Sequence, residues 1–305
     1  MENQEKKYPK ITIVATCFNR EKYIADTIES VLNQKYPNLE FIVVDDDSSD
    51  HSLEVINRYK DKLAFVGKLP GKRTNAVPVI NYALSKSTGE IMTTLNDKNL
   101  LLPGSLWAAA EIFTAYPDVE WFTGIGSIAN KDGIITSIVP IRKSYYEHFF
   151  RTPYNIQHES TFWRRSLWER TGGKFDEASP WAFDYELWCR FFAVGAKLFY
   201  VDTIIGAYRK LATAHGSTKP NEYHHYASLA REKLRAQAPR KDLVYAAIFK
   251  WLRYAKPLLR NIPDKAYEKI PFLNIYCNEA ISFKGSKSGP LVRYKRNPFR
   301  TIYPW

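Results

Sequence analysis

The segment Phe41-Ile42-Val43-Val44-Asp45-Asp46-Asp47-Ser48-Ser49-Asp50 joins an apolar run to a cluster of four carboxylates. The apolar run is rich in β-branched residues and predicts a buried parallel strand. In an open α/β sheet, ligands bind just beyond the carboxyl ends of the strands. The carboxylates therefore favour a binding site that accepts hydrogen bonds from a base or a ribose. Ser48, Ser49 and Asp50 also suit a helix N-cap, so the cluster alone leaves a structural turn as an equal alternative.

Strands and helices alternate on both sides of this segment. From the spacing of apolar residues, strands are predicted at 10–16, 40–44, 63–66, 90–95, 121–128, 134–141, 197–201 and 204–208. Helices are predicted at 23–32, 53–59, 77–84, 105–116, 166–171 and 185–194. This alternation predicts an α/β fold with a mainly parallel, Rossmann-like sheet and helices on both of its faces.

The totals limit the class of protein. The 305 residues are 45% hydrophobic, which is enough for one large α/β domain with an appendage or for two modest domains. No apolar run approaches the roughly 18 residues of a membrane span, and the first residues lack the apolar core of a signal peptide. Three cysteines, an odd and sparse number, argue against a disulfide framework and for a reducing compartment. We therefore expect a cytoplasmic protein.

The net charge of +12 is concentrated at the C-terminus. Residues 239–305 contain 14 Lys/Arg and 4 Asp/Glu, giving +10, so the first 238 residues carry 12 − 10 = +2. Residues 241–260 have helical periodicity, with apolar residues on one side and basic residues on the other. This pattern is typical of a helix lying on an anionic membrane surface, and equally of a helix that packs its apolar side on the catalytic domain. No nucleic-acid-binding module is visible, so no nucleic-acid partner is expected.

Several short motifs, in this order, resemble those of the family 2 inverting glycosyltransferases, which have the GT-A fold. They are Thr16-Cys17-Phe18-Asn19-Arg20, Val43–Asp50, Leu95-Asn96-Asp97-Lys98-Asn99 with Pro103-Gly104, Thr161–Arg165, Gly172–Glu177 and Phe183–Trp188. The resemblance runs from about Pro9 to Lys219, two thirds of the chain. It implies a GT-A domain at 8–220, with a nucleotide half at about 8–100 and an acceptor half at about 101–220. A basic, mainly helical extension would occupy 221–305.

The resemblance also implies a role for individual residues. Thr16, Phe18, Asn19 and Asp46 correspond to contacts of the nucleotide, and Asp97 lies in the loop that meets the ribose and diphosphate. Asp184 has the position of the catalytic base. An inverting transfer needs such a carboxylate to take the proton of the acceptor hydroxyl. Taken without the resemblance, the favoured role of Asp184 is the N-cap of the helix predicted from residue 185.

The loop around Asp97 departs from the family pattern. The family usually has an aspartate that binds Mg²⁺ or Mn²⁺ five residues before the loop proline, and here that position is Lys98. The next position, often also acidic, is Asn99. An ammonium group cannot ligate a divalent cation. Three interpretations remain: Lys98 replaces the metal, Asp97 shifts into the metal role, or the protein binds its ligand without catalysis.

Further contacts are expected by position. His215 is a candidate metal ligand, and Arg209 and Lys219 are candidate phosphate contacts. The residues expected on the acceptor side are Trp181, His158, Glu159 and Glu186. Glu186 could instead pair with Arg190 four residues later.

The function implied by the resemblance is transfer of a sugar, with inversion, from a nucleoside-diphosphate donor to a glycan or lipid-linked acceptor in cell-surface polysaccharide synthesis. The alternative is a catalytically silent nucleotide-sugar or glycan binder that partners an active enzyme. In either case the nucleotide sugar is the expected ligand. The expected location is the cytoplasm, and the membrane-surface interpretation of residues 241–260 would place the protein on the inner membrane face.

Overall fold

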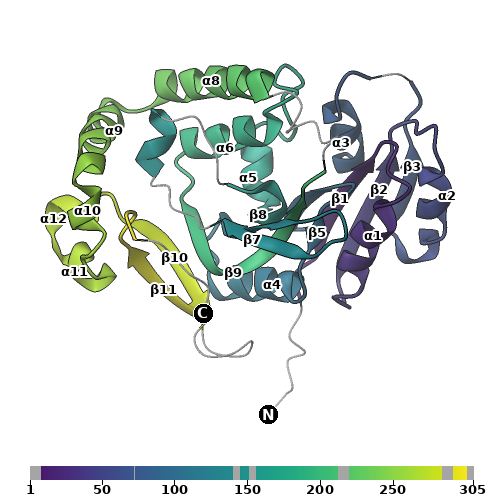
Figure 1. Ribbon diagram of the computed structural model, residues 1–305, viewed down its shortest axis with the longest axis horizontal. Helices are drawn as coiled ribbons and strands as arrows, with labels where there is room; N and C mark the ends of the chain where they lie inside the picture. Colours follow the sequence, from purple (N-terminus) through teal and green to yellow (C-terminus); the bar gives the residue numbers. More distant parts are fainter. Residues whose placement is uncertain are drawn as a thin grey trace, which may run out of the picture.

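One mixed β-sheet runs through the molecule (Figure 1). The computed structural model describes residues 8–71, 73–139, 145–150, 156–211, 220–283 and 291–300. The strands lie in the order β11-β10-β9-β6-β8-β4-β1-β2-β3, with β5 paired to β9 and β7 paired to β6. Their bounds are β1 Ile11–Cys17, β2 Leu39–Asp45, β3 Phe65–Lys68, β4 Ile91–Asn96, β5 Leu100–Leu101, β6 Trp121–Ala129, β7 Ile135–Val139, β8 Thr161–Arg164, β9 Leu198–Arg209, β10 Asn278–Phe283 and β11 Leu291–Arg296.

Helices cover both faces of this sheet. Their bounds are α1 Ile24–Leu32, α2 Ser52–Asn57, α3 Val77–Leu84, α4 Ser105–Ala115, α5 Arg165–Arg170, α6 Phe183–Ala193, α8 Pro220–Gln237, α9 Arg240–Leu252, α10 Lys256–Leu259, α11 Asp264–Lys269 and α12 Pro271–Asn274. Successive strand residues belong to different cores: Val14 packs with α3, α5 and α6, whereas Ala15 packs with α1, α2 and α4. Side chains of a strand alternate between the two faces of the sheet, and here the side chains on both faces are buried. This is expected for a strand that helices cover on both sides. The predicted parallel core with two helical layers is confirmed.

The register of the parallel strands brings three loops together. Thr16 in β1 lies opposite Val44 in β2 and Asn96 in β4, so all three strands end at the same edge of the sheet. The antiparallel strand β8 begins at this edge, because Met92 of β4 lies opposite Trp163. The loops after β1, β2 and β4 and the 3₁₀ turn His158–Ser160 before β8 therefore share one edge. We call it the carboxyl edge.

The sequence predicted two strands where the structure has one. The strands expected at 197–201 and 204–208 form one continuous strand, β9, whose register against β6 shifts around Ile125. Because of this shift, both halves of β9 stay hydrogen-bonded to β6 on either side of Asp202-Thr203. The two polar residues interrupt the apolar pattern, so the sequence predicted a break there.

The C-terminal region is helical in α8–α12, as expected, but it also completes the sheet. Strand β10 pairs in parallel with β9, and β11 pairs with β10 (Figure 1). The sheet is therefore continuous across the boundary expected near residue 220. Within the described part of the chain, the helices are too short or too polar to cross a membrane.

Candidate active site

Three of the four carboxylates at and just after the end of β2 hold the loops of the carboxyl edge in place. Asp45 accepts a hydrogen bond from the Ser48 amide at 2.9 Å, and Asp50 accepts one from the Ser52 amide, also at 2.9 Å, at the start of α2. Asp47 has a left-handed backbone (φ 60°) and pairs with Lys68 at 2.8 Å. The structural-turn interpretation thus accounts for these three acids, and it leaves Asp46 to be explained.

Asp46 faces a guanidinium. Its Oδ1 lies 2.5 Å from a terminal nitrogen of Arg73, which also donates to the carbonyl oxygens of Leu69 and Gly71 at 2.8 and 2.9 Å. Charge-assisted contacts of this kind fix both groups. Sequence reasoning missed Arg73, because its loop follows β3 without periodic pattern. The signal in the sequence was a basic residue in the loop after β3, which ends at the same edge of the sheet as the acids.

The loop after β1 is held against the loop after β2. Asn19 has a left-handed backbone (φ 52°), its amide donates to Ser48 Oγ at 3.0 Å, and its Oδ1 accepts from the Ser49 amide at 2.8 Å. Thr16 is buried at the end of β1, while the side chain of Phe18 is 51% exposed. Large exposed rings are unusual on a loop that is so tightly fixed, and a flat ring suits stacking on a nucleobase.

Asp97 is fixed between the β1 loop and a cation. Its Oδ2 accepts a hydrogen bond from the Phe18 amide at 3.2 Å, and its Oδ1 lies 3.6 Å from Arg20 Nε. Burial raises the pKa of this carboxyl to about 6, although Arg20 acts in the opposite direction. Arg20, to which the sequence analysis gave no role, thus belongs to the site.

Lys98 and Asn99 occupy the two positions at which the family usually has metal-binding acids. Lys98 is 7% exposed, and its Nζ lies 5.0 Å from the centre of the Tyr208 ring. Burial lowers the pKa of this ammonium, and the nearby Asp97 carboxylate acts against that shift. The Asn99 amide nitrogen donates to Glu159, and its Oδ1 accepts from the Arg209 amide at 3.0 Å.

These residues do not suit a divalent cation. Asp97 is the one carboxylate among residues 96–99, and it already accepts from an amide and lies between the cations Arg20 and Lys98. No group of three or more His, Cys, Asp or Glu residues that could hold a metal occurs among the residues that the structure describes. Mg²⁺ and Mn²⁺ prefer several oxygen ligands, which this loop lacks. His215, the other expected ligand, lies outside the described residues.

Asp184 lies inside the first turn of α6, not ahead of it. The helix begins at Phe183 and its N-cap is Ala182, so the N-cap interpretation of Asp184 is wrong. Its Oδ1 accepts a hydrogen bond from the Tyr185 amide at 2.7 Å. Burial raises the pKa of the carboxyl to about 6. A carboxylate whose pKa lies near neutral pH is suited to accept a proton in catalysis.

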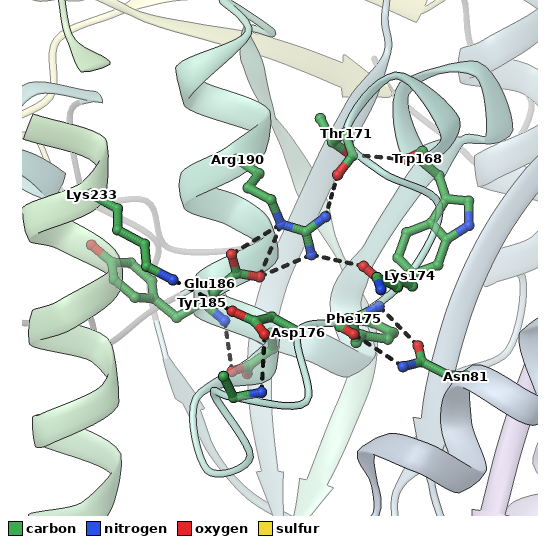
Figure 2. Close-up of polar contacts among 12 residues, drawn as sticks. Asn81, Trp168, Thr171, Lys174, Phe175, Asp176, Tyr185, Glu186, Arg190 and Lys233 are labelled. Carbon is green, nitrogen blue, oxygen red and sulfur yellow. Dashed lines mark hydrogen bonds and ion pairs between the residues drawn. The ribbon is translucent and has the colours of Figure 1, made fainter. Parts of the chain in front are cut away.

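A clamp holds the segment that leads to Asp184 (Figure 2). Both carboxylate oxygens of Glu186 accept from Arg190 at 2.9 and 3.0 Å, and Arg190 also donates to the carbonyl oxygens of Thr171 and Lys174. From α3, Asn81 exchanges two hydrogen bonds with the backbone of Phe175, at 2.8 and 3.0 Å. The pairing of Glu186 with Arg190 is confirmed. Because its carboxylate is buried and occupied, we give Glu186 this supporting role and not an acceptor contact.

The other expected contacts have different surroundings. His158 is buried, its Nε2 is paired with the Thr94 hydroxyl, and burial lowers its pKa to about 4, so the ring is neutral at pH 7. Arg209 is buried and paired with Asp26 at 2.8 Å, and its guanidinium lies over the Tyr23 ring. Both side chains therefore support the fold around the site. Trp181 is half-buried just before α6 and stays a predicted acceptor contact. Lys219 lies outside the described residues.

Glu159 connects the two ends of the site. It lies in the 3₁₀ turn before β8, and both Asp184 and Lys98 are close enough to shift its pKa. Lys98 in turn adjoins Asp97, which holds the Phe18 amide, and the Asp46 amide donates to the carbonyl oxygen of Cys17 at 2.8 Å. Hydrogen bonds and longer-range electrostatic interactions thus connect the groups along the carboxyl edge from Asp46 to Asp184.

Comparison with known sequences yields related proteins. A model of the family described as glycosyl transferase family 2 matches residues 12–171, just over half of the chain. An uncharacterized glycosyltransferase of Rickettsia typhi is 27% identical over 203 residues, covering 65% of this chain and 63% of the relative. The poly-β-1,6-N-acetyl-D-glucosamine synthase of Staphylococcus epidermidis is 24% identical over 141 residues, covering 46% of this chain and 34% of the relative. The chain thus spans less than two thirds of the length of either relative.

Solved structures share the fold. S. aureus TarS 1-349 in complex with UDP-GlcNAc has a TM-score of 0.57 at 18% identity, covering 72% of this chain and 65% of that chain. The mannosyltransferase PcManGT from Pyrobaculum calidifontis, in complex with GDP-Man and Mn²⁺, has a TM-score of 0.52 at 18% identity, covering 83% and 82%. At these identities the likeness concerns the fold alone, and the expected GT-A fold is confirmed.

Proposed function

Since the chain belongs to glycosyltransferase family 2, we propose that it moves a sugar from a nucleoside-diphosphate donor to a glycan or lipid-linked acceptor, with inversion. The observation that carries this proposal is the series of side chains along the carboxyl edge, from Asp46 through Asp97 and Lys98 to Asp184. It supplies recognition of a nucleotide at one end and a proton acceptor at the other. The relative named as a polysaccharide synthase supports a role in cell-surface polysaccharide synthesis.

The acceptor end performs the proton transfer. The acceptor hydroxyl oxygen attacks the anomeric carbon and gives its proton to the Asp184 carboxylate. The new carbon–oxygen bond forms as the bond from the anomeric carbon to the diphosphate oxygen breaks, and the diphosphate leaves with the bonding electrons. Because nucleophile and leaving group lie on opposite sides of that carbon, its configuration inverts. The raised pKa of Asp184 makes it a stronger proton acceptor than an exposed aspartate.

The donor end binds the nucleotide and balances the charge of the leaving diphosphate. Phe18 would stack on the base, Asp46 would accept hydrogen bonds from the base or ribose, and Thr16 and Asn19 would shape the loop around them. Negative charge on the departing phosphates needs a fixed positive group. Lys98 and Arg20 supply one at the position where the family has its metal. We assign Lys98 the role of stabilising the negative charge of the leaving diphosphate.

A donor panel tests the proposed function. The chain is incubated with UDP- and GDP-sugars and a set of glycan and lipid-linked acceptors, and both released nucleoside diphosphate and glycosylated product are measured. We expect one donor to give stoichiometric product and diphosphate. Binding of a donor, measured calorimetrically, without turnover across the acceptor panel would favour the silent-binder alternative. Absence of binding to every nucleotide sugar would overturn both.

We also propose that the protein works on the inner face of the membrane. The surface of α9, the 3₁₀ turn Arg253–Ala255 and α10 exposes Trp251, Tyr254 and Leu258 by 72, 77 and 75%. Lys250, Lys256 and Arg260 are exposed on the same segment. Rings with basic neighbours suit the headgroup region of an anionic bilayer. Of the apolar residues on one side of this segment, Ile248, Leu252 and Leu259 pack on the core, whereas Val244 and Trp251 are exposed.

Location in the cytoplasm fits the three cysteines, all of which are unpaired. The proposed membrane surface lies at the end of the molecule remote from β3 and α2 (Figure 1). That arrangement offers a matched control, because Lys60 and Lys62 are exposed beside β3.

Vesicle sedimentation tests the membrane surface. The full chain should sediment with vesicles that contain phosphatidylglycerol and stay in solution with phosphatidylcholine alone. The double substitution Lys250→Glu and Lys256→Glu should weaken partitioning by more than about tenfold, since each basic residue near an anionic surface contributes about 1 kcal/mol. The control pair Lys60→Glu and Lys62→Glu should have little effect. Equal losses for the two pairs, or sedimentation without anionic lipid, would contradict the assignment.

A further inference from the structure

Lys98 is a buried cation without a direct polar partner among the described residues. Its side chain is 7% exposed, and within the described ranges its Nζ makes neither a hydrogen bond nor an ion pair. Burying an ammonium group is costly unless it is paired or hydrogen-bonded. A lysine kept in this state at the carboxyl edge has three N–H donors left for an anionic ligand.

The group in contact with this ammonium is an aromatic ring. Nζ of Lys98 lies over the ring of Tyr208, 5.0 Å from its centre. The face of an aromatic ring carries partial negative charge and attracts a cation at this distance. Unlike a carboxylate, the ring has no formal charge. The contact therefore restricts the position of the ammonium and leaves its positive charge in place.

The backbone on both sides of the ring is fixed to the loop after β4. Leu100 of β5 pairs with Ala207 of β9, and the Arg209 amide donates to Asn99 Oδ1 at 3.0 Å. Side chains alternate along a strand, so Tyr208 points to the other face of β9 from these two buried neighbours. The ring is thus placed next to this loop by backbone contacts in which the ring itself takes no part.

We propose that Tyr208 is a positioning residue whose ring holds the Lys98 ammonium beside the leaving diphosphate without neutralising it. This inference rests on the proposed function. A carboxylate in place of the ring would cancel the charge that the diphosphate needs and would occupy N–H donors that should reach the phosphate oxygens. An aliphatic side chain would leave the ammonium free to turn away. A ring face avoids both outcomes.

The predicted consequence is a loss of diphosphate affinity that depends on the ring. Calorimetric titration of UDP, GDP and the matching monophosphates into the full chain first identifies the nucleotide that binds. Tyr208→Leu should then weaken binding of the diphosphate about fivefold, and binding of the monophosphate less than about twofold. Tyr208→Phe, which keeps the ring and removes only the hydroxyl, should bind both nucleotides within about twofold of wild type.

A double-mutant cycle separates positioning from general damage. In the Lys98→Met background, Tyr208→Leu should cause no further loss of diphosphate affinity, because the group that the ring positions is gone. If Tyr208→Leu fails to fold, Tyr208→Met, whose flexible side chain fills irregular space, takes its place in the same cycle.

Phe199→Leu is the matched control. Phe199 lies near the other end of β9, and the Arg293 guanidinium lies over its ring at 4.5 Å from the centre. The substitution removes a ring and a cation contact from the same strand. It should leave the ratio of diphosphate to monophosphate affinity unchanged.

The outcomes distinguish this inference from the proposed function. If wild type binds no nucleoside diphosphate, both are wrong. If wild type binds and turns over its donor, but Tyr208→Leu loses mono- and diphosphate affinity equally, only the positioning role is wrong. The same holds if Tyr208→Phe loses as much as Tyr208→Leu, or if the loss persists undiminished in the Lys98→Met background.

Discussion

Asp184→Asn is expected to lower kcat/KM for sugar transfer by about 10³-fold and to leave donor affinity unchanged. Asparagine has nearly the shape of aspartate, and its carbonyl oxygen can still accept from the Tyr185 amide, but it cannot take a proton from the acceptor. Steady-state transfer rates and calorimetric donor titration measure the two quantities. Asp176→Asn, in the loop that leads to α6, is the control and should change kcat/KM less than about twofold.

The same substitution should make the folded protein more stable at pH 8. Burial raises the pKa of Asp184 from 3.8 to about 6, so ionisation at neutral pH opposes folding. The stability that the protonated group contributes is fully present below pH 4 and is lost as the pH rises through 6. Because Asp184 is only half-buried, we expect a gain of about 2 kcal/mol for the asparagine variant at pH 8, shrinking toward pH 4. Thermal melts across this range measure it.

Loss of activity together with increased stability is the signature of a catalytic group. A residue that merely supports helix α6 would show the reverse combination, with stability lowered and activity reduced in proportion. Retention of more than a tenth of the wild-type kcat/KM by Asp184→Asn would exclude it as the base. The proton acceptor would then have to be sought elsewhere in the site.

Elements whose pattern is local could be predicted from the sequence. The helix expected at 77–84 has those bounds in the structure, because its apolar spacing and its proline in the first turn are both local signals. The run Phe41–Val44 likewise predicted β2. The position of Asp46 and of the loop at 96–99 on one edge followed from the rule that parallel strands end together.

Features that depend on distant partners could not be predicted. Strand β10 pairs with β9, with Glu279 opposite Phe199, and neither segment has a sequence pattern that identifies the other as its partner. Arg73 reaches Asp46 from a loop 27 residues away. The hydrogen bond between Glu159 and Asn99 could not be predicted, because a three-residue turn has no periodicity and the two residues are 60 positions apart. Each of these features depends on long-range packing. The same holds for the C-terminal helices, where some apolar residues pack on the core and others are exposed to solvent.

Lys98→Met should lower kcat by about 10²–10³-fold, the usual effect of removing one fixed group that stabilises charge in a transition state. Methionine fills the space of the lysine stem beside Tyr208 and adds no charge to a buried position, so the fold should persist. Lys98→Arg, the control, keeps the charge with a different shape and should retain part of the activity. The rates are measured at saturating donor, so that the effect on kcat is separated from binding.

The response to metal ions decides what supplies the positive charge. Because Lys98 stands at the family's metal-binding position and Asp97 is bonded to the Phe18 amide, EDTA should leave the wild-type rate unchanged. Added Mn²⁺ should not restore Lys98→Met, since removing an ammonium creates no oxygen ligand. If EDTA abolishes wild-type transfer and Mn²⁺ restores it, the charge comes from a bound ion. Lys98 would then lie beside the diphosphate without balancing its charge.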